Sequence, residues 1–205
     1  MMIASYIGPE GFGNSRTGLQ PWPAGLAEVL QRGEVPDGAW AALFSASCPR
    51  FGRMDGLSRL GLMAVELLGV EFADKDEVGV CLETNGGSIV ADRQFLRTLS
   101  PSVFTYTLPS TAIGEICIRH KLRGPVLCLM GVNGDGRQAL EQAQSWLQTG
   151  EVKSCLCVYA DATGDAAARA GTCCFEYGSR EDEVQKGESL VALCRRMCET
   201  RRTED

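Results

Sequence analysis

Short apolar runs that alternate with segments of helical periodicity constrain the fold of this chain most strongly. Val78–Leu82 is a run of five residues without a polar side chain, as expected of a strand that is covered on both faces of a parallel sheet. Val126–Met130 has the same character, and a helical pattern of apolar residues over Asp55–Gly69 precedes both runs. Strands that alternate with helices in this way predict an α/β fold with a mostly parallel sheet.

The complete pattern predicts a five-stranded sheet with helices on both faces. The expected strands are Ile3–Ile7, Val78–Leu82, Val126–Met130, Ser154–Ala160 and Thr172–Tyr177. The expected helices are Asp55–Gly69, Ser88–Thr98, Pro109–His120, Ala139–Thr149 and Ser189–Glu199. Because no helix joins the last two strands, we expect one antiparallel edge strand.

A length of 205 residues favours a single domain over residues 1–205. Glycine and proline punctuate residues 8–38, so this segment is expected to be an irregular excursion with one short helical pattern over Leu26–Gln31. Residues 179–205 are expected to form a C-terminal helix and tail.

Charge and hydropathy exclude several classes of function. The net charge is −6, whereas nucleic acids and anionic lipids bind clustered positive charge. No run of about 18 apolar residues occurs, and the apolar start Met1–Ile7 lacks the basic segment of a signal peptide. We therefore expect a cytoplasmic protein without a membrane span and without a nucleic acid partner.

The ten cysteines and the single histidine do not predict a metal site. The cysteines fall inside apolar runs such as Cys155–Val158, which favours reduced thiols in the core. No CxxC pair occurs, and the spacing of Cys194 and Cys198 is more typical of packing on one helix face. His120 is expected to be structural, at the end of a helix. We expect no metal and no cofactor.

A strand, a glycine-rich turn and a helix follow Gly124-Pro125. The strand is Val126–Met130 and the turn is Gly131–Gly136. This succession resembles the nucleophile elbow of a β-ketoacyl synthase, in which a cysteine begins the helix and the helix dipole lowers the pKa of its thiol. Asn133 stands at the position of that cysteine. An amide has no ionisable proton and cannot carry an acyl chain.

Other segments resemble the same family in the same order. Arg53–Leu60 resembles the opening helix of the family, and Val78–Val80 with Asn85-Gly86-Gly87 resembles its second strand and glycine turn. Ser100–Ser110 resembles the Ser-Pro, phenylalanine and proline segment that introduces the next helix. The matches span residues 54–177, so the chain is similar to the N-terminal half of the thiolase fold as β-ketoacyl synthases use it.

This resemblance implies a subunit that is not an enzyme by itself. Asn133 removes the nucleophile, and the sequence ends where a synthase would begin the half that supplies its carbonyl-binding histidines. Short chains of this pattern resemble chain length factors, which pair with an active ketosynthase in fatty acid, polyene or polyketide synthesis. The implied partners are a ketosynthase subunit or a second copy of this chain, and an acyl carrier protein.

The resemblance also implies an interface and a pocket. In the family, the elbow strand lies at a sheet edge and pairs with its counterpart across a twofold axis, and an apolar edge needs such cover. Here that strand comprises Val126, Leu127, Cys128, Leu129 and Met130, of which Cys128 is interpreted as a core thiol. The candidates for the pseudo-site and the acyl tunnel are Met130, Val132, Asn133, Gly134, Phe104, Tyr106 and Thr107.

Other interpretations of the sequence stay open. One is a self-associating module that binds acyl groups or acyl carrier protein, and another is an enzyme of unknown type that uses a different cysteine. The turn Gly131–Gly136 also suggests a phosphate cradle, but it lacks the lysine of a P-loop, and Asp135 would repel an anion. A turn in which Asp135 caps the following helix is the simpler interpretation.

Overall fold

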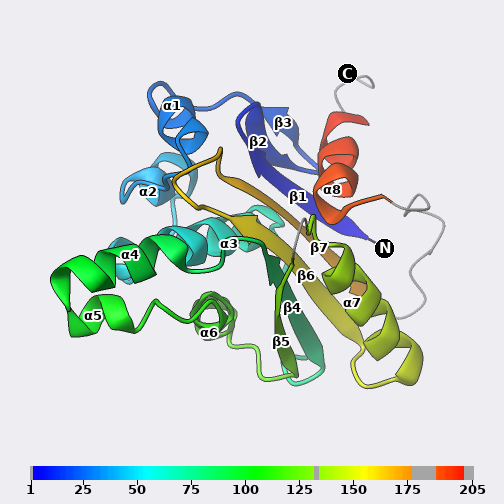
Figure 1. The fold of residues 1–205 in the computed structure, drawn as a ribbon. Helices are drawn as coiled ribbons and strands as arrows, with labels where there is room; N and C mark the ends of the chain where they lie inside the picture. Colours follow the sequence, from blue (N-terminus) through cyan, green and yellow to red (C-terminus); the bar gives the residue numbers. More distant parts are fainter. Residues whose placement is uncertain (1, 132–133, 177–187, 201–205) are drawn as a thin grey trace.

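The computed structural model describes residues 2–131, 134–176 and 188–200. Its centre is a seven-stranded mixed sheet with the order β3-β2-β1-β7-β6-β4-β5 (Figure 1). The strands are β1 (Ile3–Gly8), β2 (Gly11–Asn14), β3 (Gly18–Gln20), β4 (Val78–Thr84), β5 (Val126–Met130), β6 (Ser154–Asp161) and β7 (Arg169–Glu176). The helices are α1 (Leu26–Gln31), α2 (Ala39–Leu43), the 3-10 helix η1 (Phe51–Arg53), α3 (Gly56–Leu67), α4 (Ile89–Thr98), α5 (Pro101–Phe104), α6 (Ser110–His120), α7 (Arg137–Thr149) and α8 (Leu190–Glu199).

The sheet differs from the sequence prediction in three respects. It has seven strands and not five, because β2 and β3 continue from β1 as an antiparallel meander inside residues 8–38, which were expected to be irregular. The antiparallel pairing of β6 with β7 is confirmed, but β7 lies between β6 and β1 and is not an edge strand. Only the pairs β4–β5 and β4–β6 are parallel, so the sheet is mixed and not mostly parallel.

The helices begin and end close to the predicted residues because the chain carries local capping signals. The side chain of Asp55 accepts a hydrogen bond from the Ser58 backbone N–H at 3.0 Å and so caps α3. Gly69, with φ of +61°, follows the end of this helix in the left-handed conformation that glycine tolerates. Ser189 caps α8 in the same way as Asp55 caps α3, through the Ala192 N–H at 3.0 Å.

Helices cover both faces of the sheet, as predicted. Val80 and Leu82 of β4 point into the apolar cluster that includes α3 and α6, whereas Cys81 between them points into a second cluster with α7 and α8. Every residue of β4 is buried. Figure 1 shows α7 and α8 on one side of the sheet and α3 and α6 on the other. Strand β4, beside which the elbow strand lies, is therefore covered on both faces.

Within the described ranges, no helix is long and apolar enough to cross a membrane. All ten cysteines fall in those ranges, and none of them is in a disulfide.

Candidate functional site

Strand β5 lies at an edge of the sheet. It pairs with β4 from Val80 opposite Val126 to Thr84 opposite Met130, and no strand of the described chain pairs with its other side. Val126 and Met130 are 53% and 54% exposed. The residues between them are half-buried: Leu127, Cys128 and Leu129. The strand therefore presents unpaired backbone groups and apolar side chains outward.

Cys128 turns toward the interior from this edge. It packs against the apolar cluster that includes α3 and α6. Burial raises the pKa of the Cys128 thiol, so the thiol is protonated at neutral pH and is a poor nucleophile.

The exposed large apolar side chains lie on β5 and on the helical segment that precedes it in the chain. In the part of the chain that the structure describes, all of them lie on α4, α5, α6, β5 or the loops between these elements: Val90, Leu96, Leu99, Phe104, Leu108, Ile118, Val126 and Met130. We call these residues the apolar margin. Figure 1 shows α4, α5 and α6 on the same side of the molecule as β5. Single exposed apolar residues are ordinary, but their confinement to one side is typical of an interaction surface.

The three candidates from the Ser-Pro segment lie in different environments. Phe104 is 58% exposed and packs against the Phe95 ring at a centroid distance of 5.1 Å. Tyr106 is buried, and its hydroxyl donates to Glu115 Oε1 at 2.9 Å. Thr107 is half-buried and donates to the Phe104 carbonyl oxygen at 2.8 Å. Phe104 thus belongs to the apolar margin, whereas Tyr106 is buried and its hydroxyl is hydrogen-bonded to α6.

Tyr106→Phe is expected to lower the free energy of unfolding by about 1 to 3 kcal/mol. Glu115 is only 3% exposed and would keep its two hydrogen bonds from Arg50, at 2.7 and 2.9 Å, but lose the phenol. Burial, followed by the Glu115 hydrogen bond, raises the pKa of Tyr106, so the phenol is a donor at neutral pH. Urea unfolding measures the loss, and an unchanged midpoint would show that this hydrogen bond contributes nothing.

The loop after β4 holds the described part of the elbow turn. Two candidate residues of the turn lie outside the described residues: Val132 and Asn133. The Gly131 N–H donates to the Thr84 carbonyl oxygen at 3.0 Å and extends the β4–β5 pairing by one residue. The Gly134 carbonyl oxygen accepts from Asn85 Nδ2 at 2.8 Å. Both ends of the turn are therefore fixed to the end of β4.

Asp161, at the end of β6, in turn fixes this loop. Its Oδ1 accepts from the Gly86 N–H at 2.9 Å and from Thr84 Oγ1 at 3.2 Å. The Met130 side chain lies against Gly87, whose φ is +54°. A side chain at residue 87 would be strained and would meet Met130. The glycine turn therefore makes room for Met130 beside the elbow.

A buried carboxyl group that the sequence analysis did not identify lies under the turn. Glu83 is 0% exposed, and its Oε2 accepts from the Ala139 N–H in the first turn of α7 at 3.1 Å. Gly136 is the N-cap residue of α7 and offers no side-chain cap. The interpretation in which Asp135 caps α7 is therefore wrong, because Glu83 satisfies this donor from a neighbouring strand. The sequence signal for this carboxyl group was a single acidic residue, Glu83, directly after the apolar run Val78–Leu82.

A pocket of about 470 Å³ lies beside the turn. Its wall includes Asn85 and Gly134, the buried phenol of Tyr159, and both Arg169 and Arg195. Asn85 Nδ2 donates to the Tyr159 hydroxyl oxygen at 3.1 Å, and Arg195 forms ion pairs at 2.8 Å with carboxylates on either side. Charged side chains stand in the wall of this pocket, which does not suit an acyl chain.

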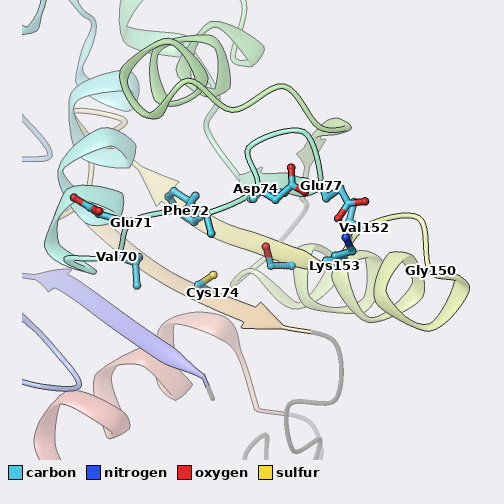
Figure 2. A pocket seen from close by; sticks show the side chains of 12 residues that line it. Val70, Glu71, Phe72, Asp74, Glu77, Gly150, Val152, Lys153 and Cys174 are labelled. Atoms are coloured by element: carbon cyan, nitrogen blue, oxygen red, sulfur yellow. Dashed lines mark ion pairs between the residues drawn. The ribbon is translucent and has the colours of Figure 1, made fainter.

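A larger pocket, of about 640 Å³, lies at the opposite end of the sheet, where β4 and β6 begin (Figure 2). Figure 2 shows the side chains of Val70, Phe72 and Cys174 around it, with the ion pair of Lys153 and Glu77 at its rim. None of the site residues that the sequence predicted lines this pocket.

His120 lies at the same distant end. It lines a small pocket with Val70 and Phe72, and its ring meets the Phe72 ring edge-on at 5.8 Å. Its Nε2 lies 3.4 Å from Glu66 Oε2, and burial lowers the pKa of this imidazole. Because the elbow follows the other end of β5, His120 is not placed to act on a group bound there.

Comparisons with known proteins agree on the fold. No family model matches the sequence, and no curated protein matches it. Among solved structures, the ishigamide ketosynthase/chain length factor matches with a TM-score of 0.63 at 19% identity, over 88% of this chain and 63% of that chain. The ketosynthase ApeO in complex with its chain length factor ApeC from Xenorhabdus doucetiae matches with a TM-score of 0.58 at 16% identity, over 86% of this chain and 77% of that chain. A ketosynthase in complex with its acyl-carrier protein, AntDE:AntF, matches with a TM-score of 0.60 at 14% identity, over 85% of this chain and 62% of that chain.

These matches show that the chain has the thiolase-like fold of ketosynthases and chain length factors, as the resemblance implied. The chain spans about three fifths of the length of the first of these structures.

Proposed function

We propose that this chain is a non-catalytic, chain-length-factor-like subunit that pairs with an active β-ketoacyl synthase in fatty acid, polyene or polyketide synthesis. The observation that carries the proposal is the apolar margin around an unpaired edge strand in a ketosynthase-like fold. Such an edge is an aggregation hazard unless another chain covers it. The matched structures include ketosynthases with their chain length factors, which supports a ketosynthase as the covering chain.

Residue 133, at the elbow, supports the proposal that this chain itself has no condensing activity. Condensation needs a thiolate to hold the acyl group, and Asn133 has none. In this pairing the ketosynthase supplies the cysteine, and this chain completes the dimer and shapes the space for the growing acyl chain.

Asn133→Cys is expected not to create a condensing enzyme. The only histidine of the sequence, His120, lies at the opposite end of the sheet, so no histidine would polarise a carbonyl held at the elbow. The measurement is the formation of a β-ketoacyl thioester by the isolated variant, from an acyl thioester and a malonyl thioester of an acyl carrier protein, followed by mass spectrometry. Steady condensation above the unsubstituted chain would contradict the non-catalytic role.

Reconstituted synthesis tests the proposal. A ketosynthase of the same genome, its acyl carrier protein and malonyl thioester are combined with and without this chain, and the products are separated by mass. We expect that product forms only in the reaction with this chain, or that product of one defined length forms only in that reaction. An identical product distribution in both reactions would overturn the proposal. Tight binding of the acyl carrier protein to a self-associated form of this chain, without a ketosynthase, would instead favour an acyl-carrier-binding module.

A further inference from the structure

The pocket of about 640 Å³ in Figure 2 lies where loops, and not a helix, cover one end of the sheet. α3 ends at Leu67, and the chain returns to β4 through a loop that supplies residues 70–74 and Glu77 to the wall of the pocket. The loop between α7 and β6 supplies Val152 and Lys153. These two loops and the strands that follow them therefore form most of the pocket.

Backbone hydrogen bonds hold both loops in place. The Lys153 N–H donates to the Glu77 carbonyl oxygen at 3.0 Å and so joins one loop to the other. The Arg123 N–H donates to the Lys75 carbonyl oxygen at 2.7 Å, and the Arg123 guanidinium donates twice to the Asp76 carboxylate, at 2.6 and 2.8 Å. The wall is therefore formed in the absence of a ligand, so a ligand would not have to order the loops.

The interior of the pocket is mostly apolar. Its apolar side chains come from the two loops, from β4 and from β7: Val70, Phe72, Ala73, Val78, Val152 and Cys174. The Ser154 hydroxyl also lines the pocket, and it forms no hydrogen bond with any residue of the described ranges. An apolar wall with a few polar groups, around a volume of roughly 300 to 1,000 Å³, is typical of a small-molecule site.

Charged side chains stand at one end of the pocket. Figure 2 shows Asp74, Glu77 and Lys153 together at this end, whereas Glu71 lies at the other end beside Val70. Lys153 forms an ion pair with Glu77, and Asp74 is exposed and forms no ion pair with the residues that the structure describes. Two carboxylates and one ammonium group give this end a net charge of −1.

We propose that this pocket binds a small molecule with an apolar body and a primary ammonium group. The body would remove the apolar wall from water, and the ammonium group would lie at the charged end, beside Asp74. A carboxylate ligand is disfavoured, because Lys153 is already paired with Glu77 and Asp74 would repel a second anion. The pocket shares no residue with the apolar margin, so this proposal does not depend on the proposed function.

Three probes with the same six-carbon chain and different head groups test the proposal: hexylamine, hexanol and hexanoate. Each is titrated at neutral pH, and the isotope-labelled methyl groups of valine are followed by NMR. We expect hexylamine to shift the signals of Val70, Val78 and Val152 with a dissociation constant on the order of 1 mM. It should bind at least about threefold more tightly than hexanoate. Equal binding of the two probes would overturn the proposal, and so would shifts confined to valines outside the pocket, such as Val126.

Asp74→Asn/Glu77→Gln removes both carboxylates from the charged end with little change of shape. The side chains of Lys153 and Glu77 are 73% and 40% exposed, so the loss of their ion pair should leave the fold intact. Lys153 then remains as the charge at this end, and we expect the preference to reverse, with hexanoate bound at least about threefold more tightly than hexylamine. Hexanol should bind as it does to the unsubstituted chain.

Glu34→Gln/Glu141→Gln is the matched control for this variant. It also removes two exposed carboxylates, but neither residue lines the pocket. We expect this control to keep the preference for hexylamine. A preference for hexylamine that persists in Asp74→Asn/Glu77→Gln would overturn the proposal, because the charged end would then not select the ligand.

Discussion

The double variant Val126→Lys/Met130→Lys is expected to bind its ketosynthase partner at least about 30-fold more weakly, a loss of roughly 2 kcal/mol or more. Both side chains are more than half exposed in the isolated chain, so the lysines would be hydrated there and the fold would be kept. In a complex across the β5 edge, the same positions would be covered, and two ammonium groups would have to leave water without a counter-charge. The dissociation constant, measured by surface plasmon resonance at fixed salt, gives the loss directly.

Gln20→Lys/Gln31→Lys is the matched control. It adds the same two charges at exposed positions on β3 and α1, away from the β5 edge. We expect this variant to bind as the unsubstituted chain does. Equal weakening by both double variants would indicate a general charge effect, and unchanged binding by the β5 variant would place the interface elsewhere.

Gly124→Ala is expected to destabilise the chain by about 3 kcal/mol, which lowers the melting temperature by about 6 to 12 °C. A Cβ at residue 124 would overlap the Val78 carbonyl oxygen and lie 2.8 Å from its carbon. These are backbone atoms of β4, so no side chain can rotate to make room. The start of β5 would have to move away and lose the hydrogen bond from the Val80 N–H to the Pro125 carbonyl oxygen at 2.9 Å.

Gly114→Ala is the control for this substitution. Gly114 lies inside α6, and a Cβ there would have no neighbour within 4 Å. Because alanine favours a helix over glycine, we expect this variant to be more stable by about 0.5 to 1 kcal/mol. Thermal unfolding followed by circular dichroism compares the two variants, and a melting temperature for Gly124→Ala within one degree of the unsubstituted chain would show that β5 can shift at no cost.

The sequence predicts those strands that consist of apolar residues throughout. Val78–Leu82 and Val126–Met130 are recognisable because each is apolar throughout, and both are strands. β2 has the sequence Gly-Phe-Gly-Asn, which has little strand propensity of its own, and its pairing with β1 and β3 makes it a strand. The neighbours of β7 could not be predicted either, because its pairing with β1 joins residues some 170 positions apart.

The sequence likewise predicted only part of the candidate site. A contiguous apolar strand next to a glycine-rich turn indicated the position of the candidate site, and Met130 is exposed at the end of that strand nearest the turn. Tyr106 and Phe104 are two positions apart, yet one is buried against Glu115 and the other is exposed, which depends on the tertiary packing of α4, α5 and α6. The hydrogen bond that Glu83 accepts comes from α7, whose first turn lies more than 50 residues further along the chain.

Native mass spectrometry of this chain, co-expressed with each ketosynthase of the same genome in turn, tests the central claim most directly. We predict an assembly whose mass equals one copy of this chain plus one ketosynthase, or a multiple of that pair, with one of these ketosynthases. Assemblies that contain only copies of this chain, or only copies of the ketosynthase, in every co-expression would contradict the account.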